Sequence, residues 1–226
     1  MLNIISYFTA GREGRCGMPP KVKFQKEEIV QAALNVARKQ GIDAVTAREV
    51  AKELGVSVGP IFTWFDSMEQ LKTEVYALAK ARYREHILRG LDEPIPFLGI
   101  WRYYLAFARQ EPELYRLLFL TRPDTVFDAG GAMEVMRFSQ NLARPSIMQI
   151  YNMDANTADK FFRNIWLAAF SFATLIVTDD CPYSDEEILA VGTEMSLALC
   201  KAYKEVPGLA EGTFDRDAIF RDLVKK

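Results

Sequence analysis

The 226-residue chain contains a single histidine, His86, and only three cysteines, Cys16, Cys181 and Cys200. A metal site would need several histidine, cysteine or acidic ligands at short spacing, and none accompanies His86. The sequence also lacks a phosphate-binding glycine loop, a nucleophile elbow and a cysteine–histidine pair suited to nucleophilic catalysis. We therefore expect a chain that is not an enzyme and that uses no metal or cofactor.

Long apolar runs are missing as well. No uninterrupted stretch approaches the roughly 20 residues that a membrane-spanning helix needs. Three distant cysteines are typical of reduced thiols, not of a disulfide framework. Residues 1–20 have no secretory signal pattern, and we interpret them as a disordered arm or a mis-assigned start, since Met18 is suited to begin the chain. The sequence thus predicts a cytoplasmic protein without a membrane partner.

Apolar residues recur at helical spacing along the rest of the chain, without strand-like alternation or internal repeats. Half of all residues are hydrophobic, which is enough for a substantial core. The pattern predicts an all-α protein of nine or ten helices, and Pro145 is expected to interrupt one of them. The expected helices are 26–40, 46–54, 57–64, 67–88, 97–110, 111–120, 133–151, 157–177, 185–204 and 214–224.

The stretch 46–71 has the features of two short helices joined by a tight turn. Thr46 and Glu49 form a capping-box pattern, Gly55 suits the left-handed end of the first helix, and Ser57 is placed to cap the second. Gly59 would let the two helices approach closely. Three apolar residues are expected to anchor the second helix: Ile61, Phe62 and Phe65. This arrangement predicts a helix-turn-helix unit.

The stretch resembles the DNA-binding domain of the TetR-type transcriptional regulators, from Phe24 to about Tyr76. The resemblance rests on Gly41, Thr46, Val50, Ala51, Gly55, Val56, Ser57, Gly59, Phe65 and Leu71. It implies a three-helix DNA-binding domain at 21–71, a linker helix at 72–90 and a ligand-binding and dimerisation domain at 91–226. The implied function is that of a dimeric repressor, released from a palindromic double-stranded DNA operator by a small hydrophobic effector.

The residues expected to contact DNA lie in and before the second helix. They are Lys21, Lys23, Thr46, Ser57, Val58, Pro60, Thr63 and Trp64. Relatives usually place a phosphate-binding tyrosine and lysine where this chain has Phe62 and Met68. Residues 21–71 also carry no net charge, although 1–89 as a whole are basic and 90–226 acidic. Because phosphate neutralisation supplies most non-specific affinity, a second hypothesis stays open: a TetR-like dimeric module that binds small molecules or proteins and has weakened or lost DNA binding.

Large aromatic and methionine side chains accumulate in the C-terminal part. Core packing explains more than half of them, while the resemblance implies a cavity for a small molecule. The ligand-binding candidates are Trp101, Tyr104, Phe107, Tyr115, Phe119, Met133, Met136, Trp166 and Phe170. An anionic ligand would need one of three arginines, namely Arg102, Arg116 and Arg137.

Two apolar helices, 157–177 and 185–204, are expected to form the homodimer interface. Neither can bury all of its apolar residues within one chain. Small residues at 168, 169, 171 and 173 would allow close helix approach, so Ala169→Glu is expected to dissociate the dimer.

Overall fold

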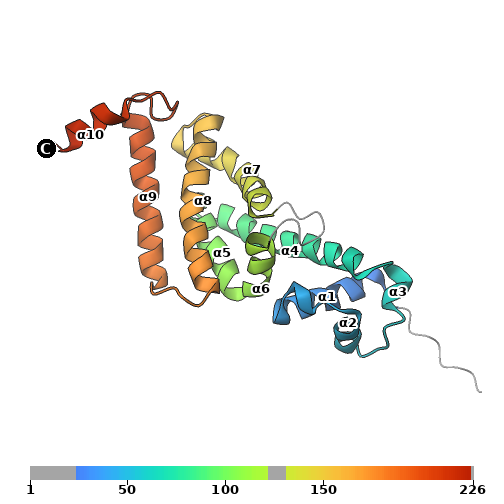
Figure 1. Cartoon of the computed structure of the whole chain (residues 1–226). Helices are drawn as coiled ribbons and strands as arrows, with labels where there is room; N and C mark the ends of the chain where they lie inside the picture. The colour runs from blue at the N-terminus through green and yellow to red at the C-terminus, as the bar shows by residue number, and fades with distance from the viewer. Residues whose placement is uncertain (1–23, 122–130, 225–226) are drawn as a thin grey trace, which may run out of the picture.

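The computed structural model of the chain describes residues 24–121 and 131–224 (Figure 1). The predicted arm 1–20 and nearly all of the predicted loop 122–131 lie outside this part. The described residues form ten α-helices and two shorter helical segments, and none of them belongs to a strand. The prediction of an all-α fold is confirmed.

The first three helices form the head, which we define as residues 24–67. It contains α1 (Lys26–Gln40), the short turn η1 (Ile42–Ala44), α2 (Ala47–Leu54) and α3 (Ile61–Trp64). α1 buries one face against α2 and α4, because its apolar residues recur every three or four positions. The head is therefore three helices around a small core of their own.

α4 (Met68–Leu91) links the head to the rest of the molecule and packs along α5 (Pro96–Gln110) (Figure 1). The sequence predicted that this helix ends at residue 88, but Gly90 lies in the last turn of α4 and faces Gly99 of α5. A Cβ on Gly99 would lie 2.1 Å from the Gly90 carbonyl oxygen. The two glycines thus bring the backbones of α4 and α5 into contact.

The remaining helices are α6 (Pro112–Tyr115), the π-helical turn η2 (Arg116–Leu120), α7 (Gly131–Tyr151), α8 (Ala155–Val177), α9 (Asp185–Glu205) and α10 (Arg216–Val224). α7 continues through Pro145, so the predicted interruption is wrong. A proline removes one hydrogen bond of the helix, and the buried residues Ala143 and Ile147 on either side keep α7 packed. Asp154 caps α8, where the sequence placed the start two or three residues later.

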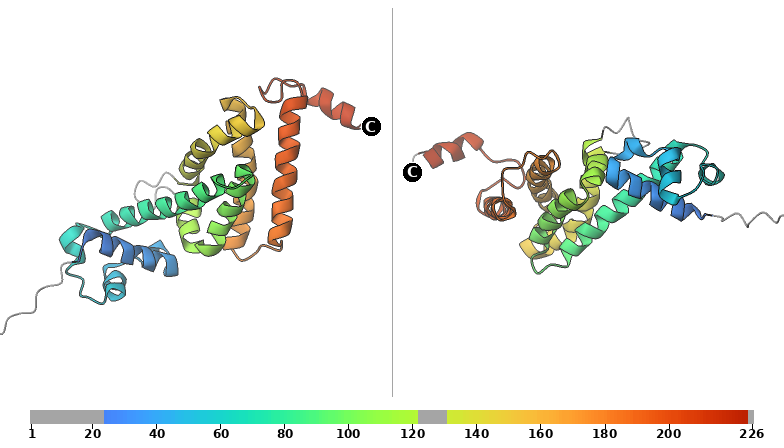
Figure 2. Two further views of the ribbon diagram at one scale, coloured as in Figure 1. Left: turned by 180° about the vertical axis from the view of Figure 1, so that it is seen from behind. Right: turned by 90° about the horizontal axis from the view of Figure 1, so that it is seen from below.

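We call α5–α9 the body. α8 packs on α5, α7 and α9, and α9 lies at the outer side of α8 (Figures 1 and 2). By length and composition α8 is apolar enough to cross a membrane, although its apolar residues do not form one uninterrupted run. Its contacts with α5, α7 and α9 bury 39% of its most apolar stretch.

Candidate functional site

Thr46 and Gly55 lie at the two ends of α2, as the sequence predicts. The Thr46 hydroxyl accepts a hydrogen bond from the Glu49 backbone N–H at 3.3 Å. Gly55 ends α2 with φ +70° and ψ 32°, a left-handed conformation that glycine adopts without steric cost. The other half of the predicted capping box is not formed, because the Glu49 carboxylate lies 3.5 Å from Lys52 Nζ. The Thr46 cap is confirmed, and the reciprocal Glu49 contact is wrong.

The second helix of the predicted helix-turn-helix unit, α3, is shorter than the predicted 57–64. It begins at Ile61, and Pro60 occupies the N-cap without a side-chain hydrogen bond, so Ser57 does not cap it. A proline disfavours helical conformation in the residue before it, which keeps Gly59 in the turn. Gly59 does not mediate a close helix contact either. A Cβ there would meet only the Ser57 hydroxyl, at 3.9 Å.

Phe62 does not anchor α3 as the sequence predicted. Ile61 and Phe65 are 0% and 1% exposed, whereas Phe62 is 52% exposed. Val58 and Trp64 are also largely exposed, and so are the hydroxyl-bearing residues Ser57 and Thr63. The outer surface of the turn and α3 therefore presents three large apolar side chains and two hydroxyl groups.

Two of the expected DNA contacts already have partners within the chain. The Trp64 indole N–H donates to the Phe24 carbonyl at 2.8 Å. The Thr63 hydroxyl donates to the Gly59 carbonyl at 3.2 Å, which leaves its lone pairs available as acceptors. In this conformation Trp64 cannot donate to a phosphate without leaving Phe24.

Most basic side chains of the described head are held in ion pairs. The pairs are Lys26–Glu74, Arg38–Glu111, Lys39–Glu53 and Lys52–Glu49. Arg48, the second residue of α2, is exposed and forms no ion pair within the described residues. Arg48 is not among the residues that the sequence pattern predicts to contact DNA, and the predicted Lys21 and Lys23 lie outside the described part. Arg48 is thus the basic group of the described head that remains available to an anion.

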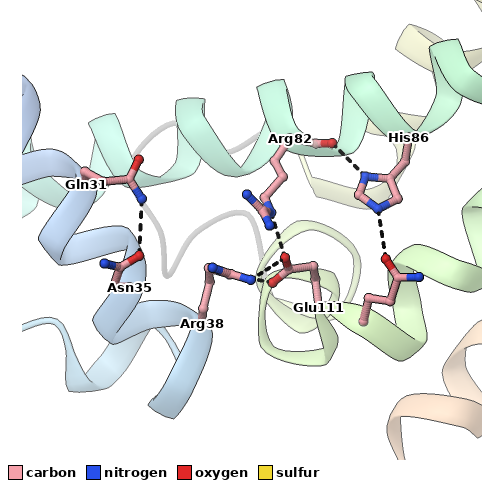
Figure 3. Close-up of polar contacts among 7 residues, drawn as sticks. Gln31, Asn35, Arg38, Arg82, His86 and Glu111 are labelled. Carbon is pink, nitrogen blue, oxygen red and sulfur yellow. Dashed lines mark hydrogen bonds and ion pairs between the residues drawn. The ribbon is translucent and has the colours of Figure 1, made fainter.

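A buried carboxylate joins the head to the body (Figure 3). Glu111, between α5 and α6, is 4% exposed. It accepts two hydrogen bonds from Arg38 of α1, both at 2.7 Å, and one from Arg82 of α4 at 2.6 Å. Burial alone would raise the pKa of Glu111, but the hydrogen bonds and charges of the two arginines outweigh it and lower the pKa below its ordinary value. The carboxylate thus stays ionised at neutral pH and connects α1 and α4 to the segment between α5 and α6.

His86 lies beside this joint and has a structural position. Its Nδ1 is 3.0 Å from the Arg82 carbonyl oxygen, and its Nε2 is 3.5 Å from Gln110 Oε1 (Figure 3). On the other side, a Cβ at Gly41, directly after α1, would lie 3.1 Å from the Glu113 carboxylate. The end of α1 therefore rests against the start of α6. Nothing in the local sequence pattern around Glu111 indicated this junction.

The centre of the body is an aromatic cluster. The Tyr83 ring lies 5.3 Å from Phe107 and 5.3 Å from Phe119, and the Tyr104 ring lies 6.3 Å from Trp166. Burial raises the pKa of Tyr104 well above its ordinary value, so this phenol is neutral at physiological pH. The cluster is uncharged and tightly packed.

The structure leaves little of the predicted pocket open. A cavity of about 20 Å³, roughly the space of one water molecule, lies among the aromatic residues. Of the candidates, Trp101, Tyr104 and Trp166 line it. Phe107, Tyr115, Phe119 and Met136 instead fill the neighbouring core, Phe170 is half-buried, and Met133 is 50% exposed. The sequence missed Tyr83, Phe97, Ile100, Phe162, Ile165 and Ala169, because helical periodicity shows that a residue is buried but not what it faces.

None of the three candidate arginines lines this cavity. Arg102 pairs with Glu93, and Arg116 donates to the Val177 carbonyl. Arg137 is exposed and donates to the carbonyl of Met133 on its own helix, at 3.2 Å. The described part of the chain therefore offers no cation to an anion bound in the aromatic core.

α9 buries only a narrow stripe, namely Ile188, Gly192 and Ser196. Leu197 of α9 is 66% exposed and Leu167 of α8 is 49% exposed. Ala169 is 4% exposed because it packs inside its own chain. A charge at Ala169 would thus disturb the core of the chain, and it is not a clean test of a dimer.

The head has a helix-turn-helix arrangement and is joined to a helical body by one long helix. Residues 29–75 match the model of the family described as bacterial regulatory proteins, tetR family. The sequence is 22% identical over 121 residues to the HTH-type transcriptional regulator PksA of Bacillus subtilis (strain 168). The match covers 43% of this chain and 59% of PksA. With the fold, these matches support the resemblance of the head to the TetR-type transcriptional regulators, and the chain spans less than two thirds of the length of PksA.

Solved structures share the fold across most of the chain. The fatty acid degradation regulator FadR from Bacillus halodurans matches with a TM-score of 0.55 and 18% identity, over 77% of this chain and 93% of FadR. The multidrug binding protein EbrR, solved in complex with imidazole, matches with a TM-score of 0.50 and 20% identity, over 75% of this chain and 93% of EbrR. At this identity the likeness concerns the arrangement of the helices.

Proposed function

We propose that the chain is a dimeric repressor that leaves a palindromic operator when a small hydrophobic effector enters the body. The observation that carries the proposal is the joint at Glu111. It ties α1 of the head and α4 to the segment between α5 and α6, next to the aromatic core. A change in that core would alter the position of the head relative to its partner. An effector shifts DNA binding only by its differential affinity for the two states.

In this proposal α3 enters the major groove of the operator. The Thr63 hydroxyl meets base edges, while Val58 and Pro60 contact thymine methyl groups. Thr46 and Ser57 hold phosphates with Arg48, and so does Trp64 once its indole N–H has left Phe24. Lys21 and Lys23 would follow the backbone as an arm does in other helix-turn-helix proteins. In the DNA-competent dimer the two recognition helices lie roughly 34–36 Å apart, one turn of DNA.

The exposed apolar surface of α8 and α9 supports the dimer. Leu167, Met195 and Leu197 are between 39% and 66% exposed on the outer side of the body. Burying them against a symmetry-related copy removes apolar surface from water. Light scattering at micromolar concentration tests this part, and a monomeric mass would contradict it.

A second function is favoured by the charge pattern of the head: a dimeric small-molecule or protein-binding module with little DNA affinity. Four of the five basic side chains in the described head are already paired with carboxylates. Phe62 and Met68 also cannot donate to phosphates. Because phosphate contacts supply much of the affinity, such a head binds DNA more weakly than a basic one.

Fluorescence anisotropy with DNA flanking the chain's own gene separates the two functions. The regulator binds this DNA at low salt and prefers it to a scrambled duplex of the same length and composition. Equal binding to both duplexes, or no binding, contradicts the regulator and favours the module. Adding Phe62→Tyr with Met68→Lys as a second protein shows whether weak binding comes from the two missing donors.

A further inference from the structure

The C-terminal helix α10 has no substantial packing partner among the described residues. Its start is well formed, since the Asp215 side chain accepts a hydrogen bond from the Ala218 backbone N–H at 3.0 Å. None of its described side chains belongs to the hydrophobic core or packs against it. A helix of only nine residues is marginal by itself in water, where about 12–15 residues are needed. α10 therefore requires a partner that the described part of its own chain does not supply.

One face of α10 is apolar and open to solvent. Phe220 is 60% exposed and Val224 is 84% exposed. The two residues are four positions apart, so their side chains lie on the same face of the helix. Asp222 lies on the opposite face, two positions from each. Apolar side chains that gather on one exposed face of a helix indicate an interaction surface.

The connection between α9 and α10 fixes where α10 leaves the body. Within it the Thr213 backbone N–H donates to the Gly208 carbonyl at 2.8 Å. Lys160 of α8 donates to the carbonyl of Ala210 at 2.6 Å, and Ala210 is buried. From there α10 runs on the side of α9 that faces away from α8, at the end of the molecule opposite the head (Figures 1 and 2). The chain thus directs α10 away from its own body.

We propose that α10 packs on the body of a second copy of this chain, so that each copy in the dimer extends α10 over its partner. The proposal rests on the dimer of the proposed function and adds to it a contact outside α8 and α9. The nine residues of α10 make a helix about 14 Å long, and packed helices lie about 8–10 Å apart. α10 can therefore reach across one helix of a copy that packs on the outer side of α9.

The neighbouring surface and the charges of α10 favour a second copy over other partners. Met195 and Leu197 of α9, the helix that precedes α10, are 39% and 66% exposed. One copy apposed to α9 covers these side chains together with the apolar face of α10. α10 itself carries two arginines and two aspartates, so it has no excess of positive charge for DNA or an anionic membrane.

Phe220→Lys tests the contact through the dissociation constant of the dimer, measured by sedimentation equilibrium. A two-fold dimer buries Phe220 twice, and each copy contributes roughly a factor of ten. We expect Phe220→Lys to raise the dissociation constant about a hundredfold. The helical content should stay, because Phe220 is exposed and lies outside the core.

Asp222→Asn is the matched control. It changes the net charge by the same amount as Phe220→Lys, but on the opposite face of α10. We expect its dissociation constant to stay within about twofold of the wild type, as for an ordinary surface substitution. Equal weakening by both variants would show an effect of charge alone and would contradict the proposed contact.

A photo-cross-link identifies the partner of α10 directly. Phe220→p-benzoylphenylalanine keeps a large aromatic side chain at this position in the full-length protein. After illumination, denaturing electrophoresis separates two joined chains from a chain that is cross-linked within itself. We expect joined chains, and a lower yield when p-benzoylphenylalanine replaces Asp222 instead.

The outcomes separate this proposal from the dimer on which it rests. A wild-type protein that is monomeric at micromolar concentration contradicts both. A dimer that Phe220→Lys does not weaken overturns the contact of α10 and leaves the dimer standing. Cross-links that are absent, or confined to one chain, overturn it in the same way, and α10 then has its partner elsewhere.

Discussion

Glu111→Gln tests the joint between head and body most directly. Glutamine keeps the size of the side chain but removes the charge that Arg38 and Arg82 share. Breaking a fully buried ion pair costs about 3–5 kcal/mol. The two arginine side chains are 36% and 39% exposed, so water can replace part of the lost interaction. We expect the free energy of unfolding to fall by about 2 kcal/mol, which lowers the melting temperature by about 4–8 °C.

The effect should depend on pH in a defined direction. In the folded chain Arg38 and Arg82 outweigh the effect of burial and hold the pKa of Glu111 below its ordinary value of 4.5. A lowered folded pKa means that the stabilisation is complete above the ordinary pKa and is lost as the pH falls through the folded pKa. The difference between wild type and Glu111→Gln should therefore be constant from neutral pH to about 4.5 and shrink below it.

Glu205→Gln is the matched control, measured by the same thermal and urea unfolding. Glu205 lies 3.9 Å from Lys201 on α9, and the two side chains are 62% and 72% exposed. A surface pair of this kind contributes less than about 1 kcal/mol. If Glu111→Gln melts within about 1 °C of the wild type at pH 7, or no lower than the control, the joint does not stabilise the chain as argued.

Three further predictions concern the DNA surface and the dimer. Phe62→Tyr with Met68→Lys should strengthen DNA binding broadly, and the lysine should steepen the slope of log affinity against log salt by up to about 0.9. Anisotropy titrations at several salt concentrations that show an unchanged slope would contradict this. Thr63→Ala should reduce discrimination between operator variants more than overall affinity, and competition binding that shows uniform weakening would argue against a base contact. Leu197→Glu should give a monomeric mass in light scattering without loss of helicity, and a dimeric Leu197→Glu protein would place the interface elsewhere. Ala169→Glu should instead lower the melting temperature, because Ala169 is buried within the chain.

Local sequence patterns predicted the bounds of a helix well where the signals that start and end it lie within a few residues. α1 has the predicted bounds, because its apolar stripe, its start and Gly41 all act within a few residues. α9 begins at the predicted residue 185, because Ser184 and Glu187 form a capping box there. The start of α3 was misplaced because Ser57 looked like a cap, while Pro60 limits the backbone just before the helix. The sequence alone does not show which of two such neighbouring signals sets the start of the helix.

Contacts between segments that are distant in the sequence could not be predicted from local patterns. Gly90 looks like a helix breaker in sequence, and only the crossing of α4 and α5 reveals its contact with Gly99. Ala169 is small enough for a dimer interface, yet it lies in the core of its own chain. The aromatic candidates were correctly expected to be mostly buried. Which of them fill the core and which border the cavity depends on the relative positions of α4, α5 and α8.

The sequence by itself determined the all-α class, the helix-turn-helix head and its resemblance to TetR-type regulators. These follow from hydrophobic spacing, caps and turns, which act over a few residues and are written in consecutive positions. The tertiary structure alone decided that Glu111 joins Arg38 and Arg82, and that Trp101 and Trp166 share one cavity. Arg38 and Glu111, for example, are 73 positions apart in the sequence. Whether such distant residues come into contact depends on how whole helices pack, which a local pattern does not encode.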